Sequence, residues 1–167
     1  MAIDKIQSES INLGDNFAFT GTVTGAGEAN TPAFAVYNTS SQSISTNSYT
    51  KLSFNSEFYD TNNAFASNKF TVPSNQGGKY FFSFASAISN LQDTNEFSAL
   101  IYKNNSSIDY SKVQGYAPAN KAVWVNNTFP MLLSASDYIE VFVYHNYGSS
   151  RDVRIENTFF TGFKVSS

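Results

Sequence analysis

Residue types that carry out most protein chemistry are scarce in this chain. Among its 167 residues there is no Cys and a single His, His145. The lack of Cys excludes disulfides, thiolate catalysis and cysteine-based zinc sites. Serines are abundant, but no Gly-x-Ser-x-Gly elbow is present and no Asp is placed by a motif to complete a triad with His145. We therefore expect His145, at the end of a predicted strand, to be a solvent-facing polar residue.

Carboxylates lie near one another in two places, Glu57 with Asp60 and Asp137 with Glu140. Cleavage of a glycosidic bond needs two acids that flank a groove. Side chains three residues apart on a strand point to opposite faces, so neither pair converges locally. The Gly77-Gly78 pair is not followed by the Lys and Ser/Thr of a phosphate-binding loop. The sequence predicts structural and turn roles for these residues, and no enzyme.

Net charge and hydropathy argue against two classes of partner. The charge of −3 and pI near 5.0 do not suit nucleic acid, since Arg151 and Arg154 are too few for a basic stripe. No run of 18 apolar residues is present, so no membrane-spanning helix is expected. The first residues, 1–5, lack the basic start and apolar core of a signal peptide. We expect a protein made in a bacterial cytoplasm and released by assembly and lysis.

The elements that must position these residues are predicted to be strands. Sixteen Phe and ten Tyr stand against six Leu, and aromatic residues favour a pleated, half-buried surface. Asn, Ser and Thr supply about a third of the chain and compete with helices through local hydrogen bonds. About ten short strands separated by turns are expected, which is typical of a sandwich or jelly roll. They are 33–37, 49–54, 58–59, 70–73, 79–88, 97–103, 107–113, 122–125, 128–133, 138–144 and 153–165, of which 79–88 is a nearly continuous apolar run expected to be buried on both faces.

The first 31 residues differ from the rest. Their apolar residues are spaced irregularly and lead into Gly21, Gly25 and Gly27, and such a stretch is typical of an extended connector. Two interpretations stay open: a disordered tail, or an arm that docks on a partner or winds with its copies in an oligomer. We predict an arm over residues 1–31 and one folded domain over residues 32–167.

Several predicted strands together resemble the C1q domains of the C1q/TNF-like family. The resemblance covers residues 32–165 in family order, and it differs from the family where Asn105 and Ser136 stand in place of the usual Gly. Asn tolerates the left-handed backbone that such a turn needs. The segments that carry it are Phe58-Tyr59-Asp60, Phe70-Thr71-Val72-Pro73, Gly78 to Phe84, Leu100 to Asn104, Ser136 to Val141, and Phe160-Thr161-Gly162-Phe163.

This resemblance implies an all-β, ten-stranded jelly roll that forms a homotrimer and has no enzymatic activity. It places Phe84 and Phe160, and also Phe34, along the threefold axis. The alternative is that all three rings belong to the ordinary core between the two sheets. Some members of the family bind Ca²⁺ through loop oxygens, so a Ca²⁺ site is the one cofactor considered. Its candidate ligands are Asp60, Asn62, Asp93, Asn95 and Asp109, for which plain turn formation is the expected role.

The segments Lys5 to Ile11 and Phe17 to Val23 resemble the leaders of phage virion proteins. Together with the composition, this predicts a virion structural protein, either a capsid decoration or a tail-fibre tip, attached to other virion proteins through residues 1–31. The alternative function is a host-receptor or carbohydrate-binding module on the jelly-roll head. Its candidate ligand-binding rings are Tyr110, Tyr116 and Tyr147, while Trp124, between two valines, is expected to be partly buried.

Overall fold

The computed structural model describes residues 30–118 and 120–166, and nearly all of their regular structure is strand. Within this part, the only helical element is a single 3-10 turn, η2 (Asp109–Ser111), and no helix is long or apolar enough to span a membrane. The strands are β1 (Ala33–Tyr37), β2 (Gln42–Ile44), β3 (Thr50–Lys51), β4 (Ser56–Asp60), β5 (Phe65–Ala66), β6 (Lys69–Thr71), β7 (Gly78–Leu91), β8 (Glu96–Lys103), β9 (Ser106–Ser107), β10 (Val113–Tyr116), β11 (Lys121–Leu133), β12 (Tyr138–His145), β13 (Arg151–Val153) and β14 (Phe159–Ser166).

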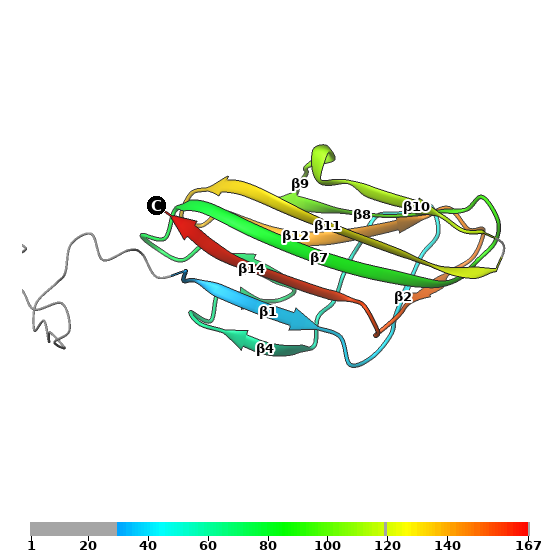
Figure 1. Cartoon of the computed structure of the whole chain (residues 1–167), viewed down its shortest axis with the longest axis horizontal. Coiled ribbons are helices and arrows are strands. Elements are labelled where there is room, and N and C mark those ends of the chain that lie inside the picture. Colours follow the sequence, from blue (N-terminus) through cyan, green and yellow to red (C-terminus); the bar gives the residue numbers. More distant parts are fainter. Residues whose placement is uncertain (1–29, 119, 167) are drawn as a thin grey trace, which may run out of the picture.

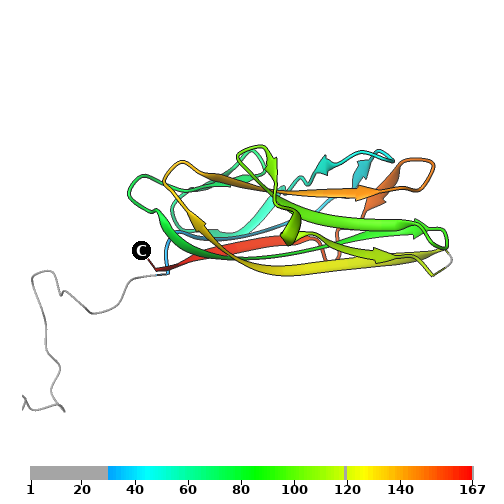
Figure 2. The ribbon, with the colours of Figure 1, turned by 90° about the horizontal axis from the view of Figure 1, so that it is seen from above.

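These strands form two antiparallel seven-stranded sheets that face each other (Figures 1 and 2). The first sheet has the order β2-β13-β7-β14-β1-β4, with β11 on the other side of β7. The second has the order β10-β8-β12-β6-β5, with β3 beside β12 and β9 beside β8. β1 begins and β14 ends at one end of the sandwich, and β2 and β13 lie toward the other (Figure 1). The all-β sandwich prediction is confirmed.

The strands differ from the sequence prediction in four respects: two boundaries, the burial of one strand and the number of strands. Asn126 and Asn127, expected to interrupt a strand, lie inside β11, where they are paired with Ala85 and Phe84. Residues 153–165, expected as one strand, form β13 and β14 with a turn between them. In β7, expected to be buried on both faces, burial alternates over the first half and becomes continuous only after that. Several elements are only two or three residues long, which gives fourteen strands in the described residues rather than ten.

Asparagine supplies much of the turn geometry. Of twelve described non-Gly residues with positive φ, nine are Asn. Asn104 and Asn105, at φ 51° and 65°, join β8 to β9 in a two-residue hairpin loop. Ser136, at φ 71°, takes the left-handed conformation in the turn that precedes β12. Both residues that stand where the C1q resemblance expects Gly therefore adopt the backbone that Gly would supply.

The space between the sheets is filled with aromatic rings. Phe34, on β1, lies 4.9 Å from the Phe70 ring of the second sheet and 4.9 Å from the Phe160 ring of its own sheet. Tyr80 and Phe82 are fully buried beside them, and the Tyr80 hydroxyl donates to the Gln76 carbonyl at 2.6 Å. Such edge-to-face and offset contacts are the favourable arrangements of aromatic pairs. One copy of the chain therefore has a complete aromatic core.

Candidate functional site

The three rings expected on a threefold axis lie inside a single copy of the sandwich. Phe34, Phe84 and Phe160 have exposed fractions of 0%, 0% and 1%. A ring with no accessible surface has nothing left for a second copy to cover. The axis assignment is therefore wrong for these three residues, and the alternative interpretation, core between the two sheets, describes them.

The outer side of the same sheet carries a second set of aromatic side chains. Successive side chains on a strand point to opposite faces, so the neighbours of the buried Tyr80, Phe82 and Phe84 point away from the interior. We call this surface the aromatic face. We define it by eighteen residues of β1, β4, β7, β11 and β14, beside which Ser56, Ala87, Ser166 and, on β13, Asp152 lie on the same side of the sheet: Ala33, Ala35, Tyr37, Phe58, Tyr59, Lys79, Phe81, Ser83, Ala85, Trp124, Asn126, Thr128, Pro130, Leu132, Phe159, Thr161, Phe163 and Val165.

Strand register arranges the centre of the aromatic face in three cross-strand rows. The first row is Ala33, Phe163, Phe81 and Pro130, with the two Phe rings 5.7 Å apart. The side chains of the middle row are small. The middle row is Ala35, Thr161, Ser83 and Thr128, and the third is Tyr37, Phe159, Ala85 and Asn126.

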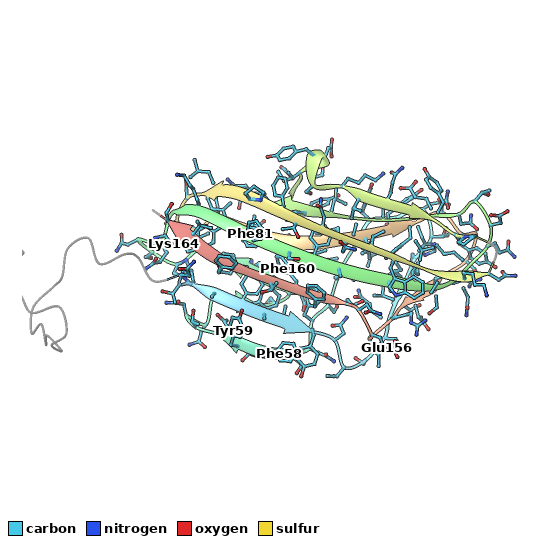
Figure 3. The ribbon with its side chains drawn as sticks, viewed as in Figure 1. Phe58, Tyr59, Phe81, Glu156, Phe160 and Lys164 are labelled. Atoms are coloured by element: carbon cyan, nitrogen blue, oxygen red, sulfur yellow. The ribbon has the colours of Figure 1, made fainter. Side chains whose placement is uncertain are left out.

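A β-bulge enlarges this face at the edge strand β4. Tyr59 is paired with Ala35 and Glu57 with Val36, so Phe58 is an extra residue between them. Phe58 and Tyr59 are consecutive, yet both are exposed, at 72% and 47% (Figure 3). Phe58 stacks on the Tyr37 ring at 4.4 Å. A bulge redirects a side chain that regular alternation would have pointed elsewhere.

An apolar hollow of about 380 Å³ lies at the end of the face where β14 finishes. Phe81, Pro130, Leu132 and Val165 line it, and Leu132 is 71% exposed. Of the eighteen residues of the aromatic face, Lys79 alone is charged. A contiguous apolar surface with few charges is the usual mark of an interaction site on a soluble domain.

The predicted ligand-binding rings do not form one site. Tyr110, in η2, is 74% exposed and rests 5.0 Å from the Phe129 ring. Tyr116, at the end of β10, is 58% exposed. Tyr147 follows β12, and the Arg151 guanidinium covers its ring at 3.6 Å. Trp124, expected to be partly buried, is 54% exposed on the aromatic face, because Val123 and Val125 turn inward on either side of it.

His145 is buried, contrary to the expectation of a solvent-facing residue. Its Nε2 lies 3.3 Å from the Ile44 carbonyl, and its Nδ1 accepts from the Tyr147 N–H at 3.2 Å. With Nδ1 accepting, Nε2 carries the proton. Burial lowers the pKa of His145; the Ile44 carbonyl works against that, and the nearby Arg151 charge adds to it. The neutral ring therefore serves as a structural link between β2 and β12.

Three of the four paired carboxylates, Asp60, Asp137 and Glu140, have structural partners. Asp137 accepts from the Ser134 N–H and the Asn104 amide and is paired with Lys103 at 2.8 Å. Burial works to raise the pKa of Asp137, but these hydrogen bonds and the Lys103 charge lower it on balance. Glu140 is paired with Lys51 at 3.0 Å. No pair converges on a groove as a glycosidase pair would.

The proposed oxygen ligands are also engaged in turns. Asp60 accepts the N–H groups of Ala64 and Phe65, at 2.9 and 2.8 Å, and Asp109 accepts the Ser107 hydroxyl at 3.0 Å. Within residues 30–118 and 120–166, no three His, Asp or Glu side chains gather to hold a metal ion. The Ca²⁺ site stays a sequence prediction.

Comparison with known proteins shows which fold carries this face. No protein-family model and no curated protein sequence matches the chain. The globular domain of zebrafish complement 1qA superposes with a TM-score of 0.61 and 17% identity, over 81% of this chain and 97% of that domain. The chain has the C1q/TNF-like jelly-roll fold. Murine APRIL at pH 5.0 (TM-score 0.59, 10% identity, 80% and 98% coverage) and Eiger TNF from S. frugiperda (0.56, 15%, 81% and 92%) share this jelly roll.

The structure shows where the segments that resemble C1q domains lie. The motif segments named from the sequence fall on β4, β6, β7, β8, β12 and β14 of the jelly roll, in the expected order. The predicted arm, residues 1–31, lies almost wholly outside the described residues. The sequence prediction did not include the aromatic face. It could have been found by assigning the odd-numbered positions of 79–85 and 159–165, instead of the even-numbered ones, to the surface that contacts another copy.

Proposed function

We propose that the chain assembles as a non-enzymatic homotrimer through its aromatic face. The observation that carries this proposal is an exposed, almost uncharged sheet face with Phe58, Trp124 and Leu132 each more than half exposed. Burial of apolar surface contributes about 25 cal/mol for each Å² removed from water. Several such side chains, covered on each of three copies, would offset the entropy lost on association.

A second copy of the chain suits this face better than an unrelated partner. Tyr116 on β10 and Trp124 on β11 are exposed on the edge strands of the two sheets, so each copy presents an apolar edge that continues the aromatic face. Contact of the face of one copy with the edge of the next is a heterologous interaction, which closes into a ring when the rotation permits. The C1q/TNF-like resemblance implies three copies in that ring.

The proposed place of the trimer is a virion, as a capsid decoration or a tail-fibre tip. The resemblance of residues 5–23 to phage leaders, the absence of Cys and the Asn/Ser/Thr-rich composition support it. Residues 1–31 would attach the trimer to other virion proteins. β1 begins at one end of the sandwich, so the opposite end, with β2 and β13, would project from the particle (Figure 1).

Light scattering or mass photometry of the full chain tests the assembly. Phe159→Glu places a charge on the aromatic face and should give folded monomers. Tyr49→Glu is the matched control, because both rings are 38% exposed but Tyr49 lies on the outer side of the second sheet, beside Tyr144. The control should remain trimeric. A wild-type chain that stays monomeric at high concentration, or a Phe159→Glu chain that stays trimeric, contradicts the proposal.

The virion role needs a separate experiment. Antibodies against the folded domain, applied to purified phage particles, should label the capsid or the tail tip, and removal of residues 1–31 should abolish incorporation while leaving the trimer intact. Particles without label, from a culture that makes the chain, would refute the virion role and leave the assembly proposal standing.

A further inference from the structure

A polar cleft lies at the end of the sandwich away from the start of β1. Two adjoining hollows of about 300 and 490 Å³ lie beside β13 and the last residues of β7. Ser89, Asn90 and Asp152 line both hollows, so they stand where the two meet. We call this place the distal cleft. The volume of each hollow falls in the range of about 300–1,000 Å³ found for small-molecule sites.

A break in the sheet register builds the shared wall of the distal cleft. From Leu91 to Ile88, β7 advances three residues while its partner β11 advances two, from Lys121 to Val123. Asn90 takes φ 55° in this bulge, and the Arg151 Nε donates to its carbonyl at 3.1 Å. A regular β7 would alternate the side chains of residues 89 and 90 between the two faces. Bulges of this kind occur beside functional sites, where they redirect side chains.

Three polar groups on this wall are available to a ligand. Within the described chain, no protein group hydrogen-bonds the Ser89 hydroxyl, the Asn90 side-chain amide or the Asp152 carboxylate. Together they offer a hydroxyl, an amide that both donates and accepts, and a carboxylate that accepts only. Ile155, 40% exposed, adds an apolar wall. This combination matches a ring that bears hydroxyl groups on its rim and C–H groups on its face.

The charges around the cleft favour an uncharged ligand. Arg151 donates to Asn90, Ser149 and Ser150 and lies over Tyr147, and the Arg154 guanidinium faces Glu156 at 3.3 Å. Both arginines are therefore engaged within the protein. Asp152 and Glu156 would repel an anion at the same place, so an acidic ligand gains little.

We propose that the distal cleft binds a neutral saccharide through adjacent hydroxyl groups, with Asp152 accepting from two of them and Asn90 bonding a third. In this arrangement Tyr147 supports Arg151 and does not stack on the sugar. The proposal does not depend on trimer formation. It gives the jelly roll a recognition site at the end that would project from a particle (Figure 1).

Saturation-transfer NMR of the full chain with glucose, galactose, mannose and N-acetylglucosamine tests the proposal, followed by calorimetric titration of any sugar that binds. At least one should bind at millimolar concentration, and glucuronic acid should bind more weakly than glucose. Asp152→Asn should weaken binding by about tenfold or more, because hydrogen bonds to a charged group are the strong ones. Asn90→Gly, which keeps the left-handed bulge and removes the amide, should also weaken it.

Asp93→Asn is the matched control, since Asp93 is an exposed carboxylate in a turn outside the cleft. It should bind sugar like the wild type. The proposal is overturned if none of the four sugars binds, if Asp152→Asn and Asn90→Gly bind as well as wild type, or if glucuronic acid binds best. Light scattering on the same samples separates the two proposals, because a monomer that binds sugar refutes only the assembly.

Discussion

Phe160 and Phe163 lie three residues apart on β14 and belong to different regions of the molecule. Phe160 points into the sandwich, where its ring lies 4.9 Å from Phe34 and is 1% exposed. Phe163 points to the aromatic face, where its ring lies 5.7 Å from Phe81. The interior and the aromatic face share a residue type and even the same strands. They differ in whether the chain itself covers the rings.

The two sets of rings therefore contribute to two processes, the folding of one chain and the association of several. Rings buried by their own chain contribute to folding at any concentration, while rings left exposed contribute only when another molecule covers them. An aromatic content of this size can therefore supply two separate surfaces. The predictions below test whether the two regions are as independent as their positions indicate.

The largest effect is expected from truncation of an interior ring. Phe160→Ala should lower the free energy of unfolding by about 3–5 kcal/mol, because it removes buried surface and leaves a cavity that the sheets cannot close. Urea unfolding at a concentration where the chain is monomeric measures it. Phe163→Ala is the control on the same strand and should cost much less in the monomer while weakening association. Equal losses in the two variants would mean that the face belongs to the core.

A smaller effect is expected where the interior lacks room for a methyl group. A Cβ at Gly162 would lie 2.7 Å from Phe82 Cε1 and 3.0 Å from Phe34 Cε1, closer than carbon atoms pack. Gly162→Ala should therefore lower the free energy of unfolding by about 1–3 kcal/mol. Gly148→Ala, at a position with no atom within 4 Å of the added carbon, should be neutral in the same urea series. A neutral Gly162→Ala would show that the two rings can move apart.

Alternation along the strands made much of the fold predictable. The run from Tyr80 to Phe84 divides into two faces by position alone, and Asn104 with Asn105 indicates a hairpin because both tolerate positive φ. What alternation cannot give is the direction of the interior. Both faces of residues 80–84 carry Phe, so the sequence did not identify which set of rings a single chain would bury. The resemblance assigned Phe84 to the threefold axis, and Phe84 belongs to the set that one chain buries.

The distal cleft was less predictable still. Asn90 lies at the end of an apolar strand, just before the turn at Asp93 and Thr94, and its bulge exists because β11 pairs with β7 out of step over Leu91 to Ile88. Register between strands far apart in sequence depends on the whole sheet. Likewise, nothing local to His145 indicates that β2 will cover it, because the contact with Ile44 spans 101 residues.

The smallest effect expected concerns pH and again separates the two regions. Burial and Arg151 hold the pKa of His145 below its ordinary value of 6.5, so the unfolded chain binds this proton more readily than the folded one. The free energy of unfolding should therefore keep its full value above pH 6.5 and decrease below it, by at most about 1.4 kcal/mol per pH unit. Urea unfolding from pH 7 to pH 5 measures this slope, and His145→Gln should flatten it.

The aromatic face contains no Asp, Glu or His, so association measured over the same range should hardly change. If association weakens in step with monomer stability in the wild type and not in His145→Gln, then the interior and the aromatic face are coupled, and their separation does not hold.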